Sequence, residues 1–208
     1  MIKYVINLKS ATERLEKYNL EEFKRHEATS RQEVSEELDK RIVSMYNLPR
    51  HNHLARCACF HSHYTLLKKI VFLKQNNVLI LEDDAIPSGH PMPDTFDPNA
   101  LTYVAGWFHQ IKMMDNSQVI YDSKCGVNEL GDFRIVGAVA YVIPRWEVAA
   151  AILEHLDNKK RWRAIDIEFY NLPIDKKYIY PAPYLEDRSE SQIDTKRKRY
   201  TNEYYKLI

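Results

Sequence analysis

Short apolar runs alternate with helical patterns along the chain, and this alternation is the strongest constraint on its fold. Residues 3–8 (KYVINL) and 78–85 (VLILEDDA) predict buried strands. The S-x-x-E pattern of residues 10–13 predicts the start of a charged helix that runs to about residue 26. A further helix is expected over residues 57–74, where apolar side chains recur at helical spacing. Strands that alternate with helices indicate an α/β protein with a mostly parallel central sheet flanked by helices.

The second half of the chain continues this pattern. Residues 101–108 and 136–144 predict two more strands, and residues 146–156 predict a helix. Residues 86–99 contain four prolines and are expected to form a restrained loop directly after the acidic end of the 78–85 strand. Residues 27–56, which Pro49 interrupts, are expected to form a short helix and a loop.

Composition narrows the classes of function. The chain has 208 residues and a formal net charge of +1, so no bulk field points to nucleic acid or an anionic membrane as a partner. Five glycines are too few for the Gly-rich phosphate loops of two large enzyme classes. No signal peptide and no membrane span is expected from the sequence, which indicates a cytoplasmic protein. Cys57, Cys59 and Cys125 are then expected to be reduced thiols.

Three adjacent carboxylates, Glu82, Asp83 and Asp84, end the 78–85 strand. Ligands of open α/β sheets bind beyond the carboxyl ends of the strands, which is where these residues are expected. Side chains alternate along an extended strand, so Glu82 and Asp84 are expected on one side and Asp83 on the other. Two carboxylates on one side suit Mg²⁺ or Mn²⁺ completed by substrate phosphates. The alternative is that the triplet only ends the strand and caps the next turn.

A second carboxylate candidate lies in the segment RWRAIDIEFYNLP, where Asp166 stands among apolar neighbours. A carboxylate in such surroundings could serve as a general base. The alternative is an ordinary helix start in which Asp166 pairs with Arg161 or Arg163.

The segment CACFHSH (57–63) alternates cysteine and histidine and could suggest zinc. The spacing argues against zinc, because helical residues two apart point to roughly opposite sides. We interpret the segment as a helix N-terminus whose Ser62 and His63 face a ligand, since free backbone N–H groups attract anions there. Cys57 and Cys59 are expected to pack in the core.

Five segments in this order resemble glycosyltransferase family 25. YVINLKSATER is similar to the opening strand of the family, RCACFHSHYTLLKKI to its G-C-x-x-S-H helix, and VLILEDDA to its E-D-D strand. VGAVAYVIPRWEVAAAIL is similar to its G-x-x-A-Y-x-I segment, and AIDIEF with YIYPAP to its C-terminal elements. Position 56 is Arg where many relatives have Gly or Glu, and the chain is short for the family. These departures leave the acceptor and the subgroup open, including a divergent virus-encoded relative.

The resemblance implies one GT-A domain over residues 1–185, with a charged helix or tail at 186–208. It implies an inverting hexosyltransferase with a nucleotide-sugar donor, expected to be a UDP-sugar, and a glycan or glycoprotein acceptor. It also implies Mn²⁺ or Mg²⁺ as the cofactor. The residues that it assigns are Asn7, Leu8, Arg14, Ser62, His63 and Asp83 for the donor, Asp84 and Glu82 for the metal, and Asp166 for the base.

Two other functions fit the same residues. Clustered carboxylates near lysines could bind two metals in a nuclease, although that function predicts a basic groove. A sugar-binding or nucleotide-binding module could also keep the fold without turnover.

Overall fold

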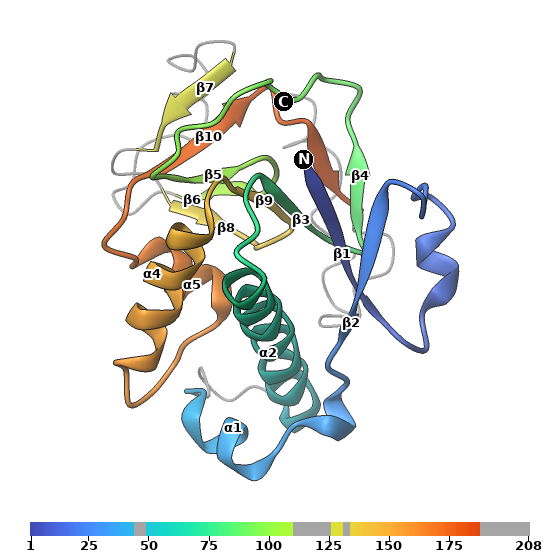
Figure 1. Ribbon diagram of the computed structural model, residues 1–208. Coiled ribbons are helices and arrows are strands. Elements are labelled where there is room, and N and C mark those ends of the chain that lie inside the picture. The colour runs from blue at the N-terminus through green and yellow to red at the C-terminus, as the bar shows by residue number, and fades with distance from the viewer. Residues whose placement is uncertain (44–48, 110–125, 131–133, 188–208) are drawn as a thin grey trace.

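A mixed seven-stranded sheet forms the centre of the computed structural model, which describes residues 1–43, 49–109, 126–130 and 134–187 (Figure 1). Five strands run in one direction, and the other two run against them. The α/β fold with a mostly parallel sheet is therefore confirmed. In spatial order the strands are β2 (Phe23–Ala28), β1 (Ile2–Leu8), β3 (Val78–Glu82), the reversed β9 (Ala140–Ile143), β5 (Leu101–Tyr103), β10 (Lys176–Tyr180) and the reversed β7 (Gly126–Glu129).

Helices of very different length accompany the sheet. The α-helices are α1 (Glu36–Arg41), α2 (Arg50–Phe72), α4 (Trp146–Asp157) and α5 (Ile165–Tyr170), and the 3₁₀ helices are η1 (Thr12–Leu15) and η2 (Arg31–Glu33). Two small sheets complete the fold, β4 (Ala85–Pro87) with β11 (Tyr184–Glu186) and β6 (Trp107–His109) with β8 (Arg134–Val136). The 146–156 helix is confirmed as α4.

Alternating side chains of the central strands build two cores. Tyr4 of β1 and Ile80 of β3 face the helices α2, α4 and α5 on one side of the sheet. Val5 and Leu81 face the opposite side, where Leu15 and Tyr18 from the η1 region cover them. Since residues 78–81 are buried on both faces, β3 is the apolar central strand that its composition predicts.

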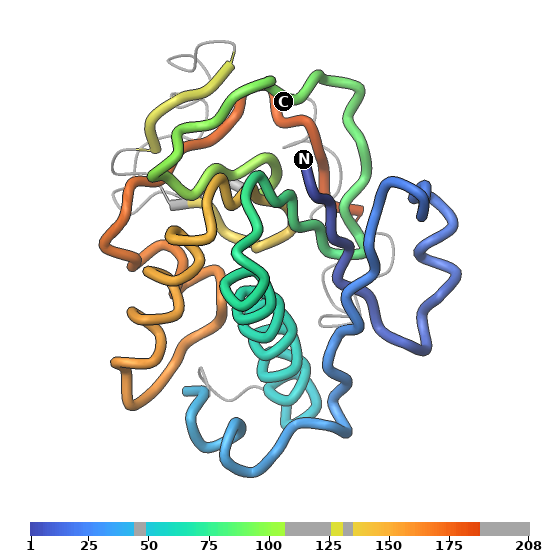
Figure 2. The backbone as a smooth tube through the Cα atoms, viewed as in Figure 1, coloured from blue at the N-terminus to red at the C-terminus, as the bar shows by residue number. Residues whose placement is uncertain are grey.

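The helix expected over residues 10–26 is wrong. The chain forms only the short η1, leaves the sheet in a wide turn and returns as β2, parallel to β1 (Figure 2). Asn19 closes the turn, since its backbone oxygen accepts from the N–H groups of Glu22 and Phe23, both at 2.9 Å. The charged residues belong to an edge strand, where Lys24 and Glu27 are exposed to solvent. Pairing with β1 outweighs the local helical preference.

The helix expected at residue 57 begins earlier, at Arg50, with Pro49 as its N-cap residue. Cys57 and Cys59 therefore lie two turns inside α2, and the interpretation of CACFHSH as a helix N-terminus is wrong. Cys57 is buried in the core as expected, whereas Cys59 is only partly buried. Cys125 lies outside the described residues.

The predicted domain boundary after residue 185 falls inside β11. Residues 188–208 are not among the described residues. The division into a catalytic domain and a charged tail therefore stays a prediction.

Glycines divide both apolar runs of the second half. Gly106 separates β5 from β6 with φ +125°, and Gly137 separates β8 from β9 with φ +87°. A Cβ atom on Gly106 would lie 2.5 Å from Cγ2 of Ile135, which is buried. The 101–108 run therefore forms two short strands, whereas the 136–144 run forms β9 and shares only Val136 with β8. At Gly106 the positive φ and the close approach of Ile135 favour glycine.

We predict that Gly106→Ala lowers the free energy of unfolding by about 1–3 kcal/mol more than Gly89→Ala does. Gly89 has a similar φ of +88°, but nothing lies within 4 Å of an added Cβ, so it controls for backbone strain alone. Urea denaturation measures both variants. Equal losses would contradict the close packing of Gly106 on Ile135.

Candidate active site

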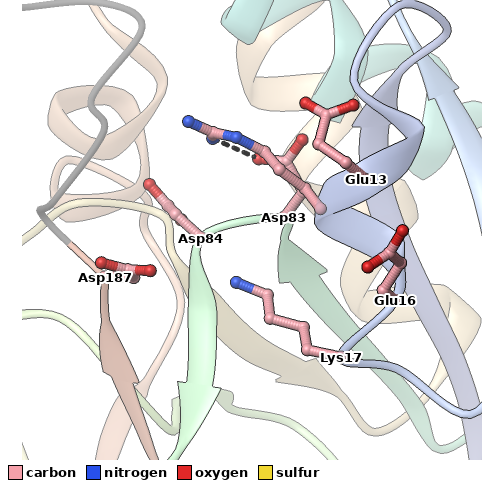
Figure 3. Close-up of a pocket in the computed structure, with 7 residues that line it drawn as sticks. Glu13, Glu16, Lys17, Asp83, Asp84 and Asp187 are labelled. Carbon is pink, nitrogen blue, oxygen red and sulfur yellow. Dashed lines mark hydrogen bonds and ion pairs between the residues drawn. The ribbon is translucent and has the colours of Figure 1, made fainter.

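The acidic triplet lies where β3 ends. Glu82 is the last residue of β3, and Asp83 and Asp84 form the turn that leads into β4. Because the extended backbone stops at Glu82, strand alternation does not separate the two aspartates. Both line one cavity of about 420 Å³, together with Glu13, Arg14, Glu16, Lys17 and Asp187 (Figure 3).

Asp83 is held by two residues from the first segment of the chain. The Asn7 amide donates to Oδ2 of Asp83 at 2.8 Å and to the backbone oxygen of Ala11 at 2.8 Å. The Arg14 guanidinium pairs with Oδ1 of Asp83 at 3.0 Å. Asn7 and Arg14, which the family resemblance assigned to the same site as Asp83, therefore both contact Asp83.

Asp84 has no comparable support. Its Oδ1 is buried without a hydrogen-bond partner in the described part of the chain. Burial raises the pKa of Asp84 well above its usual range, and the charges of Glu82, Glu186 and Asp83 add to this rise against the opposing effect of Arg14. A buried carboxylate of this kind is stabilised by a proton or by a cation.

Tyr18 fixes the backbone on both sides of the turn. Its hydroxyl lies 2.5 Å from the backbone oxygen of Ala85 and 3.2 Å from that of Glu82. Burial raises the pKa of Tyr18 and keeps the donor proton in place. On the other side of the turn, Asp187 donates its backbone N–H to the oxygen of Asp84 at 2.7 Å.

Lys17 brings a cation to the cavity (Figure 3). Burial lowers the pKa of Lys17, and the nearby carboxylates of Asp187, Asp84 and Asp83 act against that effect. The cavity therefore combines five acidic side chains with Lys17 and Arg14. This mixture suits a metal ion and an anionic group bound together better than it suits a polyanion alone.

Glu82 faces α2 and does not line the cavity. Its Oε1 lies 2.9 Å from Nε2 of His63 and 3.6 Å from Sγ of Cys59. Since an ionised Glu82 only accepts hydrogen bonds, Nε2 of His63 donates and Nδ1 accepts from Tyr141 at 2.8 Å. His63 therefore supports Glu82 from a buried position in α2.

Ser62 and Leu8 are likewise not among the residues that line the cavity. The Ser62 hydroxyl donates to the backbone oxygen of Ala58 at 2.8 Å and accepts from the N–H of Thr29 at 2.9 Å. The backbone oxygen of Leu8 accepts from Arg25 at 3.0 Å. In this structure both residues connect β2 to its neighbours.

Asp166 lies in the first turn of α5. Its Oδ2 accepts from the N–H of Gly137 at 3.2 Å, and its Oδ1 accepts from the N–H of Ile167 at 2.9 Å. Burial raises the pKa of Cys59, and the charges of Glu82, Asp166 and Asp84 add to it. All three carboxylates therefore act on one thiol. The predicted pairing of Asp166 with an arginine is not among the described ion pairs.

A family model described as glycosyltransferase family 25 (LPS biosynthesis protein) matches residues 1–169. The chain belongs to glycosyltransferase family 25. The match covers the segments that carry Asn7, Arg14, the acidic triplet and Asp166. Membership implies a glycosyltransferase that acts on a sugar donor and an acceptor. A comparison with individual curated proteins gave no match.

No helix in the described ranges of this family 25 glycosyltransferase is long and apolar enough to cross a membrane.

Two groups of possible metal ligands were missed in the sequence of this family 25 member. They are Asp39, His53 and Cys57, and Cys59, His63 and Glu82. Each group contains a cysteine and a histidine four residues apart, which lie on one face of α2. The sequence signal was this i, i+4 spacing, and the alternation within CACFHSH obscured it.

We predict that Asp84→Asn raises the melting temperature of the metal-free protein at pH 7. The expected rise is about 2–4 °C for each kcal/mol by which the free energy of unfolding increases. A carboxyl with a raised folded-state pKa supports the fold while it is protonated and loses that support as the pH rises through this pKa. Asparagine imitates the protonated carboxyl, so the difference in melting temperature between the variant and the native protein should shrink as the pH falls toward about 4. Differential scanning calorimetry with a chelator present measures it.

Asp83→Asn is the matched control, because Asp83 has the partners Asn7 and Arg14. This variant should lower the melting temperature. If Asp84→Asn also lowers it at pH 7, Asp84 is not the unsupported charge of this turn.

Proposed function

We propose that the protein transfers a sugar, as a hexosyltransferase, from a nucleoside-diphosphate donor to a hydroxyl group of a glycan or glycoprotein. UDP-sugars are the donors that we expect from the family. The observation that carries the proposal is the buried, unpartnered Oδ1 of Asp84, in a cavity that also contains Lys17 and Arg14. An oxygen ligand with the cations of Lys17 and Arg14 beside it suits a diphosphate bound with a hard divalent cation.

The buried Oδ1 of Asp84 suits Mn²⁺ or Mg²⁺, and Glu82 would be the second ligand from the adjacent position outside the cavity lining. Oε1 of Glu82 already contacts His63 and Cys59, so Oε2 is the oxygen that Glu82 would offer. Among nearby charges, that of Glu82 has the largest effect on the pKa of Asp84, after burial. A bound ion supplies positive charge that makes the diphosphate a better leaving group.

The residues around the ion would bind and orient the donor. Lys17 and Arg14 place positive charge where the diphosphate leaves, and Arg14 is itself oriented by Asp83. We assign Asn7 and Leu8 to the region of the base and ribose, beyond the lining of the cavity, because they lie at the carboxyl end of β1. Ser62 and His63 would support the site indirectly. Ser62 accepts a hydrogen bond from Thr29 directly after β2, and His63 contacts Glu82.

Asp166 is proposed as the general base. The acceptor oxygen forms a bond to the anomeric carbon, its proton passes to Asp166, and the bond to the diphosphate breaks with its electron pair. One displacement of this kind inverts the sugar. Each oxygen of Asp166 accepts one backbone N–H and keeps a lone pair for the proton, so these bonds orient the carboxylate without blocking it.

The cavity gives the nuclease alternative little support. Five of its seven side chains are acidic, which disfavours a nucleic-acid backbone. No described observation favours a module without turnover over an enzyme.

We predict that a UDP-sugar with Mn²⁺ raises the melting temperature of the native protein and is turned over, whereas Mn²⁺ with DNA gives no cleavage. Asp84→Asn should lose both the stabilisation and the turnover. Asp166→Asn should keep the stabilisation and lose about 10²–10⁴-fold in turnover, because it removes only the proton acceptor. Thermal-shift screening of UDP-, GDP- and CMP-sugars with and without Mn²⁺, followed by a nucleotide-release assay, measures these effects.

Asp94→Asn is the control, because Asp94 is an exposed residue of the proline-rich loop and should change neither result. DNA cleavage without donor turnover would overturn the proposed function. Full turnover by Asp166→Asn would overturn only the choice of base. Donor binding without any turnover would favour the binding module.

A further inference from the structure

We propose that Asp39, His53 and Cys57 form a zinc site that joins α1 to α2, separate from the acidic cavity. Asp39 comes from α1, whereas His53 and Cys57 lie one helical turn apart in α2. Their ligand atoms all lie within 4.8 Å of one another. The proposal does not depend on the proposed sugar transfer.

A hydrogen bond from His53 to Asp39 accounts for two of the three possible ligand atoms and leaves the Cys57 thiol only in contact with Nε2. Nε2 of His53 lies 2.8 Å from Oδ1 of Asp39 and also 3.5 Å from Sγ of Cys57. A ring nitrogen carries either one proton or one lone pair. If Nε2 donates to Asp39, it cannot accept from the thiol, and if it accepts from the thiol, it turns a lone pair toward a carboxylate. A cation between the three atoms would satisfy them together.

The separations suit zinc. Bonds of about 2.0–2.1 Å to nitrogen and about 2.3 Å to sulfur place the two atoms about 3.5 Å apart in a tetrahedral site. Sγ of Cys57 and Nε2 of His53 already have this separation. The oxygen of Asp39 would move out by about half an ångström, and the fourth position stays open to water. A thiolate and an imidazole select zinc over Mg²⁺ or Mn²⁺.

The proposed zinc site has two buried ligands and one ligand that solvent can reach. Cys57 is fully buried, and the His53 side chain is only 7% exposed, so the helix holds two ligands in place. The Asp39 side chain is 21% exposed and opens the site to solvent. The core contacts of α1 come from buried Leu38 and from Ile42, its buried C-cap residue. Asp39 already forms ion pairs with Arg50 and His53 of α2, and a metal crosslink would strengthen this attachment.

Arg50 competes for the same carboxylate. Its guanidinium donates to both oxygens of Asp39, at 2.6 and 2.7 Å. The Arg50 side chain is 64% exposed, so it can leave without disturbing the core. If the group is a metal site, removal of this competitor should strengthen metal binding. If it is only an ion-pair clamp, removal should create no metal binding.

The site lies apart from the proposed donor site along α2. In Figure 1, α1 lies beside the end of α2 that is farther from the sheet. Cys59 and His63, which contact Glu82, follow further along the helix. Cys57 and Cys59 are only two residues apart but belong to different groups, which makes them a matched pair for a test.

Cobalt is the probe, because thiolate ligation of Co²⁺ gives a charge-transfer band in the near ultraviolet. We predict that the chelator-treated native protein develops this band with one equivalent of Co²⁺ and that Zn²⁺ removes it. Cys57→Ser should lose the band, Cys59→Ser should keep it, and Arg50→Gln should reach it at lower Co²⁺ concentration. Circular dichroism shows whether each variant is folded.

If Cys57→Ser does not fold, Asp39→Asn serves instead and should weaken Co²⁺ binding by at least about tenfold, since even indirect support of a metal ligand is worth that much. The absence of a band in the native protein would overturn the proposal. A band that is lost in Cys59→Ser but kept in Cys57→Ser would place the ion at Glu82 and overturn it too. A band that survives both serine variants would also contradict it.

Discussion

The parallel pairing of β1 with β3 determines where the acidic turn lies. Its register sets Ile6 beside Glu82, so Asn7 of β1 meets Asp83, the first residue after β3, and the two form a hydrogen bond. The same Asn7 amide reaches Ala11, which ties the start of η1 to the strand end. η1 then presents Arg14, and the turn after it presents Lys17, to the cavity. One strand pair therefore brings two distant segments into one site.

The three carboxylates of the turn are stabilised to different degrees. Glu82 has His63 and Cys59, and Asp83 has Asn7 and Arg14, but Asp84 has an oxygen without a described partner. An isolated buried charge costs the fold free energy, so a chain that keeps one is expected to use it. The proposed nucleoside-diphosphate donor would give that charge a use, because a leaving diphosphate needs charge compensation.

Much of the fold and part of the site could be predicted from the sequence. The β3 strand and the acidic residues after it follow from an uninterrupted apolar run. The prediction of a helix over residues 10–26 was wrong because pairing with β1 outweighs the local helical preference. The start of α2 was missed because residues 50–56 have little apolar periodicity. The contact of Arg14 with Asp83 spans 69 residues and depends on strand register, which no local pattern reveals. The possible metal ligands on α2 could have been predicted from the i, i+4 spacing of histidine and cysteine. The two-residue alternation within CACFHSH obscured that spacing.

The central claim is that Asp84 holds a divalent cation at a donor diphosphate. Crystals of the protein with UDP and Mn²⁺, measured at the manganese absorption edge, test it most directly. The account predicts an anomalous peak within coordinating distance of the Asp84 carboxylate and of the diphosphate, and no such peak in Asp84→Asn. A peak in the native crystals that contacts neither Asp84 nor the diphosphate, or a diphosphate bound outside the cavity of Arg14 and Lys17, would contradict it.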